Sequence, residues 1–186
     1  MKEVIIFIDS GYLYYISKYL GKGKPLKYKI EEFASRLAKQ RGLTCKKIYF
    51  YLAPQFQSPS PNQEENKRKA NYDKFIEKLK QIELPIVIRE GRCQKIDNTF
   101  QQKGVDTLMT MDLLKASQKR EASAIILLTS DTDFVPIIEE IRKDFGIKVI
   151  LAYFTDKKRK SPFSLSNHLW RVCDEYILIK REHFGG

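Results

Sequence analysis

Two aspartates follow directly after an apolar run in the second half of the chain. Residues 125–128 are Ile-Ile-Leu-Leu, and Asp131 and Asp133 come shortly after them. An uncharged apolar run of this length is typical of a strand that is buried on both faces, in a parallel sheet covered by helices. In such a sheet the chemistry gathers where the strands end, at their carboxyl edge. We therefore expect both carboxylates to lie at a functional edge.

Two further aspartates are predicted to reach the same edge. Asp9 follows the apolar run 4–8, and Asp106 opens a helical pattern just after a Lys-Gly pair. If the two apolar strands are neighbours, Asp9 and Asp131 end side by side. Like charges at such short range repel each other, and some of them take up protons unless a cation lies among them.

A divalent cation would relieve this repulsion. Mg²⁺ and Mn²⁺ prefer oxygen ligands and keep several waters, and they can polarise a phosphodiester and lower the pKa of an attacking water. The candidate metal ligands and catalytic residues are Asp9, Asp106, Asp131 and Asp133. A second interpretation stays open, in which Asp9, Asp106 or Asp133 caps a helix by accepting backbone N–H bonds. Asp112 is a weak candidate, expected at the surface or in an ion pair.

Alternating strand and helix patterns predict one three-layer α/β domain over residues 1–186. The predicted strands are 4–8, 47–52, 85–89, 124–128, 147–152 and a short last one at 175–179. The predicted helices are 11–20, 30–41, 63–82, 105–117, 134–145 and 161–172. Residues 91–104 are polar and weakly patterned, so we expect a loop or an edge hairpin there.

Composition narrows the class of partner. The net charge is +11, which favours a polyanionic partner, with nucleic acid first and an anionic membrane surface second. Three cysteines without a Cys-x-x-Cys pair do not indicate a disulfide framework or a zinc site. No stretch approaches the roughly 18–20 apolar residues that span a bilayer, and the first residues lack a signal-peptide pattern. We therefore expect no membrane segment and a cytoplasmic location.

Three blocks of the sequence together resemble the signature of a known family. They are residues 8–13 (Ile-Asp-Ser-Gly-Tyr-Leu), residues 103–106 (Lys-Gly-Val-Asp) with 111–114 (Met-Asp-Leu-Leu), and residues 129–136 (Thr-Ser-Asp-Thr-Asp-Phe-Val-Pro). In these blocks, and in their order along nearly the whole chain, the sequence is similar to the NYN domain. This domain is the LabA-like branch of the PIN-like nucleases.

The resemblance implies a Rossmann-like parallel sheet of about five strands in the order 3-2-1-4-5, with helices on both faces. It also implies a metal-dependent ribonuclease that uses Mg²⁺ or Mn²⁺, and it maps the family's acidic residues onto Asp9, Asp106, Asp131 and Asp133. Two positions depart from the family pattern. Tyr12 stands where the family usually has Asn and cannot supply an amide, and Ser130 replaces a family Gly, so we expect slower turnover or an altered substrate preference.

An RNA strand over the acidic edge needs positive charge beside it. Lys103 is the nearest predicted phosphate contact, or alternatively the salt-bridge partner of Asp106. The other predicted substrate-binding residues are Ser10, Tyr12, Ser130, Lys67, Arg68, Lys69 and Arg92, with further backbone contacts at Lys95 and residues 157–160. At most one of Tyr12, Tyr14 and Tyr15 is expected to stack on a base.

Three functions remain open at this point. The first is a metal-dependent endoribonuclease that acts on single-stranded RNA. The second is an RNA-binding module that keeps the acidic edge but has little or no turnover. The third, a phosphatase-like α/β enzyme, is disfavoured because the sequence has no Gly-x-Gly-x-x-Gly, no Walker lysine loop and no Asp-x-Asp at the first strand. A homo-oligomer or a partner protein is compatible with each.

Overall fold

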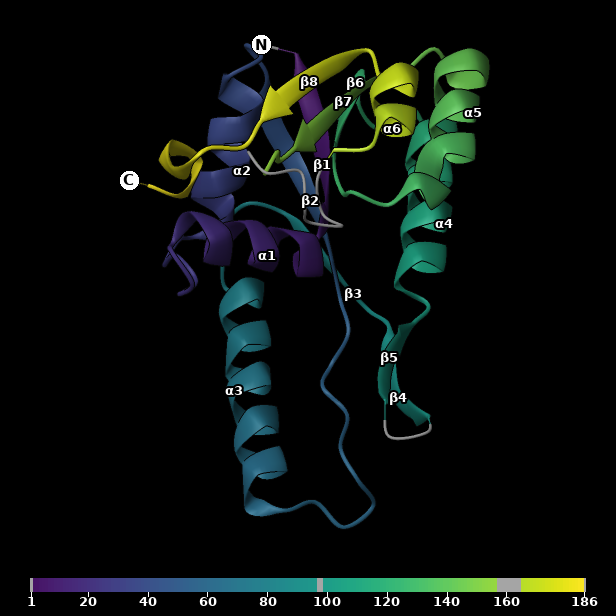
Figure 1. The fold of residues 1–186 in the computed structure, drawn as a ribbon. Helices are drawn as coiled ribbons and strands as arrows, with labels where there is room; N and C mark the ends of the chain where they lie inside the picture. The colour runs from purple at the N-terminus through teal and green to yellow at the C-terminus, as the bar shows by residue number, and fades with distance from the viewer. Residues whose placement is uncertain (1, 97–98, 157–164, 186) are drawn as a thin grey trace.

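The computed structural model describes residues 2–96, 99–156 and 165–185. The strands are β1 (Glu3–Asp9), β2 (Thr44–Leu52), β3 (Ile86–Glu90), β4 (Arg92–Ile96), β5 (Thr99–Lys103), β6 (Ala124–Leu128), β7 (Lys148–Tyr153) and β8 (Glu175–Leu178). The helices are α1 (Ser10–Leu20), α2 (Ile30–Lys39), α3 (Gln63–Lys80), α4 (Val105–Gln118), α5 (Val135–Phe145) and α6 (Asn167–Val172), with short 3₁₀ turns η1 (Thr132–Phe134) and η2 (Arg181–Phe184). Figure 1 shows their arrangement.

The main sheet has six parallel strands in the order β3-β2-β1-β6-β7-β8. The predicted sheet of about five strands in the order 3-2-1-4-5 is therefore corrected in both its count and its order. Two strands of a separate hairpin, β4 and β5, intervene in the chain before β6. The short strand β8 joins the sheet beside β7, where pairing satisfies its backbone groups. The expected neighbourhood of the strands that carry Asp9 and precede Asp131 is confirmed, because β1 pairs with β6.

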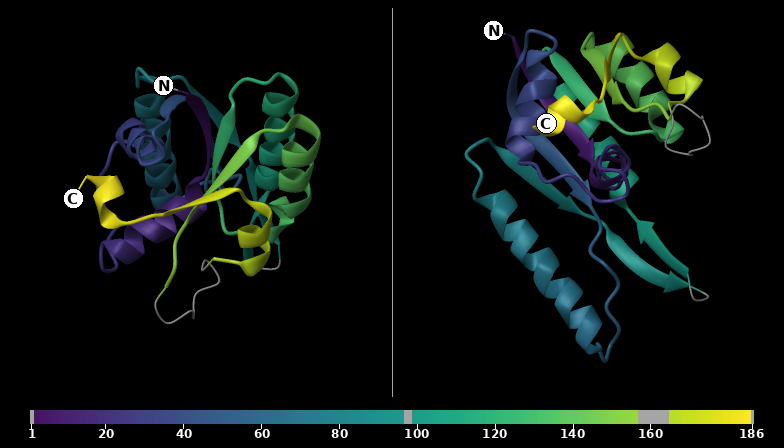
Figure 2. Two further views of the ribbon diagram at one scale, coloured as in Figure 1. Left: turned by 90° about the horizontal axis from the view of Figure 1, so that it is seen from above. Right: turned by 60° about the vertical axis from the view of Figure 1, so that its left-hand side comes forward.

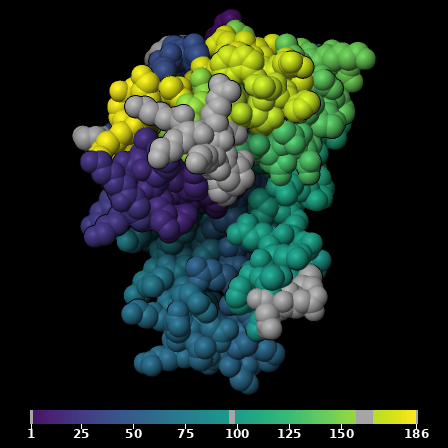
Figure 3. All heavy atoms as spheres, viewed as in Figure 1, coloured from purple at the N-terminus to yellow at the C-terminus, as the bar shows by residue number. Residues whose placement is uncertain are grey.

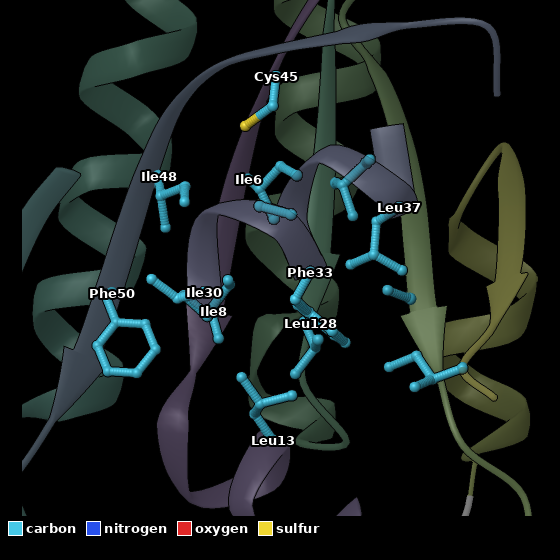
Figure 4. Close-up of a cluster of buried hydrophobic side chains, with 14 of the residues drawn as sticks. Ile6, Ile8, Leu13, Ile30, Phe33, Leu37, Cys45, Ile48, Phe50 and Leu128 are labelled. Atoms are coloured by element: carbon cyan, nitrogen blue, oxygen red, sulfur yellow. The ribbon is translucent and has the colours of Figure 1, made fainter. Parts of the chain in front are cut away.

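Helices cover both faces of the sheet, as predicted (Figure 2). Side chains alternate between the two faces along a strand, and β1 shows this directly. Its residues Ile6 and Ile8 face a cluster with buried side chains of α1, α2 and α3, which Figure 4 shows in part. Its residues Ile5 and Phe7 face a second cluster with α4, α5 and α6. The sheet that contains this strand is therefore apolar on both faces and forms the middle layer of three.

Part of the chain extends beyond the carboxyl edge of the sheet. We call it the arm: the 53–62 linker, α3 and the antiparallel β4–β5 hairpin. In Figures 1 and 2 the linker runs down between α3 and the hairpin, and Figure 3 shows the same face filled in, with the arm below the body. Only the end of α3 enters the core, through Ile76 and Leu79. The stretch 91–104, predicted as a loop or an edge hairpin, is a hairpin that stands apart from the main sheet.

The cysteines form no disulfide: Cys45 and Cys173 are buried as free thiols, and Cys93 is a half-buried one. Burial raises the pKa of both buried thiols to about 12. Within the described ranges, no helix combines the length and the apolar character that crossing a bilayer requires.

Candidate active site

Asp9 and Asp131 lie at the ends of two adjacent strands. Asp9 is the last residue of β1, and Ile8 before it pairs with Leu128, the last residue of β6. Asp131 follows three residues after Leu128 and begins the turn η1. The sequence prediction that these two aspartates reach one edge is therefore confirmed by the strand register.

The same two carboxylates also act as local caps. Asp9 Oδ1 accepts hydrogen bonds from the N–H groups of Gly11, at 2.9 Å, and of Tyr12, at 3.3 Å. Asp131 Oδ1 accepts one from the N–H of Asp133, at 2.9 Å. The capping interpretation thus holds for Asp9. In both aspartates the second oxygen, Oδ2, has no hydrogen-bond partner in the part of the chain that the structure describes, so it is available to a ligand.

Asp106 and Asp133 are not caps. Asp106 is the second residue of α4, whose N-terminal cap is Gly104, and Asp133 lies within η1 behind the capping Asp131. Gly104 has a φ of 84°, a conformation that glycine adopts at little cost and that turns the chain from β5 into α4. This turn places Asp106 in the first helical turn, with its side chain exposed.

Gly91 further fixes the start of α4. A Cβ on Gly91 would lie 2.7 Å from the carbonyl oxygen of Lys103 and 2.7 Å from Cγ2 of Val105. Only glycine permits this close approach between the end of β3 and the junction of β5 with α4. The contact anchors the segment that carries Asp106.

The four aspartates are coupled electrostatically. Burial raises the pKa of Asp9, and the negative charges of Asp106 and Asp131 raise it further, against the two backbone N–H bonds that lower it. Partial loss of solvent around the carboxylate raises the pKa of Asp106, and the negative charges of Asp131 and then Asp133 raise it further. Each of the four carboxylates therefore takes part in a common field of negative charge.

The four carboxylates are suitable ligands for Mg²⁺ or Mn²⁺, but in this structure they do not converge on one point. Carboxylate oxygens are the ligands that these ions prefer. Among the residues that the structure describes, no three acidic, histidine or cysteine side chains surround one point closely enough to hold an ion. The expected meeting of all four aspartates around a shared cation is thus not reached. Oδ1 of Asp9 and of Asp131 accepts hydrogen bonds from nearby backbone N–H groups, which leaves Oδ2 of each for a partly hydrated ion.

Asp112 lies in a buried ion pair and not in the candidate site. Its side chain is buried and ion-pairs with Arg89 of β3, and it accepts a hydrogen bond from the hydroxyl of Tyr51 at 3.0 Å. The prediction of an ion pair is confirmed, whereas the prediction of a surface position is wrong. The available signal was its place on the apolar stripe of the helix, where a carboxylate must find a buried partner.

The Tyr12 side chain is buried and does not reach the surface. Its side chain is 2% exposed in the core beneath α1, and its hydroxyl accepts a hydrogen bond from the N–H of Phe154 at 2.9 Å. A buried ring cannot stack on a base, so its prediction as a substrate-binding residue is wrong. Ser10 and Ser130 are half-buried beside Asp9 and Asp131, where their predicted contact with substrate stays a prediction.

The predicted phosphate-binding cations that the structure describes lie on the arm. Arg68 and Lys69 of α3 form exposed ion pairs with Glu64 and Asp73, one turn away. The other four have no ion pair within the described ranges; they are Lys67, Arg92, Lys95 and Lys103. Lys103 therefore does not form the alternative salt bridge with Asp106. The predicted contacts at 157–160 lie outside the described residues.

The chain is similar to known proteins in both its sequence and its fold. A stretch of 56 residues is 38% identical to the uncharacterized protein y4oD of Sinorhizobium fredii, and it covers 30% of this chain and 26% of that protein. The crystal structure of a protein of unknown function from Vibrio parahaemolyticus matches 98% of this chain and 95% of its own, with a TM-score of 0.66 and 17% identity, which shows a shared fold. The NYN domain model matches residues 3–180. The chain therefore belongs to the NYN domain family, a PIN-like family of the nuclease type.

Proposed function

We propose that this chain is a metal-dependent endoribonuclease that hydrolyses phosphodiester bonds of single-stranded RNA with Mg²⁺ or Mn²⁺. Membership of a nuclease-type family supports a hydrolase acting on RNA. The net charge of +11 supports a polyanionic substrate. A cluster of carboxylates at one edge of such a basic chain supports a cation that binds between them.

One observation carries the proposal: the acidic residues of three separate chain segments share one field. The charge of Asp106 raises the pKa of Asp9, although the two residues are 97 positions apart, from 9 to 106, and the charge of Asp131 raises the pKa of both. Mutual repulsion costs folding energy, and local capping alone would not bring the segments together. A bound cation would offset the cost and use the open Oδ2 atoms of Asp9 and Asp131.

In this proposal Asp9 and Asp131 hold the ion, and Asp106 and Asp133 complete the negative rim around its waters. When bound, Mg²⁺ or Mn²⁺ would polarise the phosphodiester and lower the pKa of the attacking water. Lys103, the last residue of β5 and three positions before Asp106, supplies a cation for a phosphate oxygen of the substrate.

A second function is favoured by a different observation. Asp9 and Asp131 each give one oxygen to local backbone amides, and no three described ligands converge on a point. An RNA-binding module of the NYN type with weak or no turnover would have this arrangement permanently. A phosphatase-like enzyme is a third alternative, which hydrolysis of a small phosphomonoester without RNA cleavage would favour.

The test is cleavage of a single-stranded RNA by purified protein with Mn²⁺, with Mg²⁺ and with a chelator. We expect cleavage that needs the metal and that Asp131→Asn lowers by about 100-fold or more. Asp144→Asn is the matched control, because Asp144 is an exposed acid on α5 outside the site. Equal cleavage by Asp131→Asn and the unmodified protein would overturn the proposal. Binding without cleavage would establish the second function instead.

A further inference from the structure

The arm carries an aromatic pair that neither hydrophobic core cluster includes. Phe100 on β5 is 62% exposed, and its ring centroid lies 5.6 Å from that of Phe56 in the linker. Single exposed apolar side chains are common on proteins, but adjoining rings beside a cavity mark a binding surface. The linker and the hairpin that carry the pair belong to the arm, which extends beyond the carboxyl edge (Figure 1).

A cavity of about 320 Å³ opens beside the two rings, between the linker, α3 and the hairpin. Besides Phe56 and Phe100, its lining includes the side-chain amides of Gln55 and Gln102 and the guanidinium of Arg68. Aromatic rings offer a face for stacking, amides offer both donors and acceptors to a base edge, and a guanidinium contacts phosphate or stacks on a ring. Together these groups match the chemistry of an unpaired nucleotide.

The two strands of the hairpin next to the cavity carry positive charge and no acidic side chain. Their ten residues contain Arg92, Lys95 and Lys103. In the described part of the chain none of these three cations forms an ion pair, unlike Lys69 of α3, which lies 2.7 Å from Asp73. Cations that lack an intramolecular partner remain available to phosphate groups.

The hairpin leads directly to the acidic edge. Along strand β5, Phe100 and Lys103 are three residues apart, which is about 10 Å at the usual rise per residue. After Gly104 the chain enters α4, whose first turn carries Asp106. A nucleic-acid strand with one base beside Phe100 would therefore pass Lys103 on its way to the aspartates.

We propose that the Phe56–Phe100 cavity is a base-binding subsite, which stacks one unpaired nucleobase of an RNA strand and directs its backbone along the hairpin cations to the aspartates. The inference rests on the proposed function in taking RNA as the substrate. It puts a base platform on the arm, whereas the sequence prediction allowed at most one such ring among Tyr12, Tyr14 and Tyr15 of α1. A base held in a duplex cannot enter the cavity, so the subsite selects single strands.

The test measures binding of a fluorescein-labelled single-stranded RNA oligonucleotide by anisotropy, in a chelator so that no metal-dependent cleavage occurs. Phe100→Ala should weaken binding about 5-fold or more, the loss typical of one stacked base. Phe100→Trp should retain affinity, whereas Phe100→Leu should lose as much as alanine, because stacking needs a ring. The matched control is Phe75→Ala, which removes a ring that is 43% exposed on α3 and lines a separate cavity.

A second substrate separates stacking from general attraction. On an oligonucleotide of the same length whose sites are abasic, Phe100→Ala should bind as tightly as the unmodified protein. Unchanged affinity of Phe100→Ala for the normal oligonucleotide would overturn the subsite, and so would a change in sedimentation without a change in RNA binding, which would make the rings a contact between copies. If Phe100→Ala also keeps full metal-dependent cleavage with the same KM, the subsite is wrong and the nuclease stands. No RNA binding by the unmodified protein would overturn both.

Discussion

Arg89 of β3 holds Asp112 of α4 with two parallel hydrogen bonds, from Nε to Oδ2 and from Nη2 to Oδ1, both 2.7 Å long. The carboxylate is buried, and it also accepts a bond from the hydroxyl of Tyr51, which pairs with Asp9 in the sheet register. This cluster joins β3 and β2 to the helix that carries Asp106. It therefore fixes the orientation of α4 relative to the carboxyl edge.

Arg89→Ala should destabilise the protein by about 3 kcal/mol, because it leaves the buried Asp112 charge without its partner. The figure lies at the lower end for buried pairs, since the Arg89 side chain is 38% exposed. Urea denaturation at neutral pH measures it. Arg68→Ala removes an exposed pair with Glu64 and should cost less than about 1 kcal/mol. Equal effects of the two substitutions would show that the Asp112 cluster contributes no special stability.

Asp106→Asn should stabilise the protein at neutral pH in a chelator. The pKa of Asp106 is above its ordinary value in the folded chain, because of burial and the charges of Asp131 and Asp133. Ionising it therefore costs more in the folded than in the unfolded state. This loss of stability is absent below the ordinary pKa of 3.8 and develops as the pH rises through the folded pKa.

Thermal melts of Asp106→Asn and the unmodified protein across this pH range test the sign. The melting temperature of the variant should be higher at neutral pH, and the difference should disappear as the pH falls toward 3.8. Asp144→Asn, on α5, should show no such pH-dependent gain. A variant that is less stable at neutral pH would mean that Asp106 makes a favourable contact that outweighs the repulsion.

The Tyr12 hydroxyl should matter for stability and not for turnover. Tyr12→Phe leaves the buried N–H of Phe154 without its acceptor, which costs about 1–2 kcal/mol. Tyr12→Asn, which restores the usual family residue, also removes a buried ring and should cost about 3–5 kcal/mol. Denaturation curves and RNA cleavage rates check both effects. A faster Tyr12→Asn enzyme would contradict this assignment and return position 12 to the substrate.

The positions of the acids were predictable because they depend on strand order and not on detail. Residues 4–8 and 125–128 are uncharged, which indicates strands buried on both faces, and both are followed by aspartate. Parallel neighbours must then end at one edge. The direction of each carboxylate depends instead on whether it bonds to backbone N–H groups or to a ligand. The sequence is compatible with both.

Tyr12, β8 and the arm show what the sequence left undetermined. The spacing of the tyrosines in α1 fits a helix, but it does not say which ring points to the core; Tyr12 is 2% and Tyr14 55% exposed. The short strand predicted at 175–179 is confirmed as β8, but its four residues do not indicate whether it joins the main sheet, which therefore has six strands where about five were expected. The polar hairpin has no apolar face that would direct it to the sheet, so its place beyond the edge follows from tertiary contacts such as that at Gly91.

Mn²⁺ should bind to the carboxyl edge and stabilise the folded chain in competition with protons. The ligands must be deprotonated to bind a cation, and the pKa of Asp9 and that of Asp106 are both raised. We therefore expect the affinity for Mn²⁺, measured by titration calorimetry, to fall as the pH is lowered from about neutral through these raised values. Added Mn²⁺ should raise the melting temperature of the unmodified protein, because an ion that binds only the folded state stabilises it.

The double variant Asp9→Asn, Asp131→Asn separates this site from weak surface binding. It removes both open Oδ2 carboxylate positions, so Mn²⁺ should no longer change its melting temperature, whereas Asp144→Asn should respond like the unmodified protein. Because the asparagine side chains keep an oxygen that can accept the N–H bonds of Gly11 and Asp133, the caps are retained and the variant should fold. An equal response of the double variant to Mn²⁺ would place the ion elsewhere, and the carboxyl edge would then be a pair of caps with no metal chemistry.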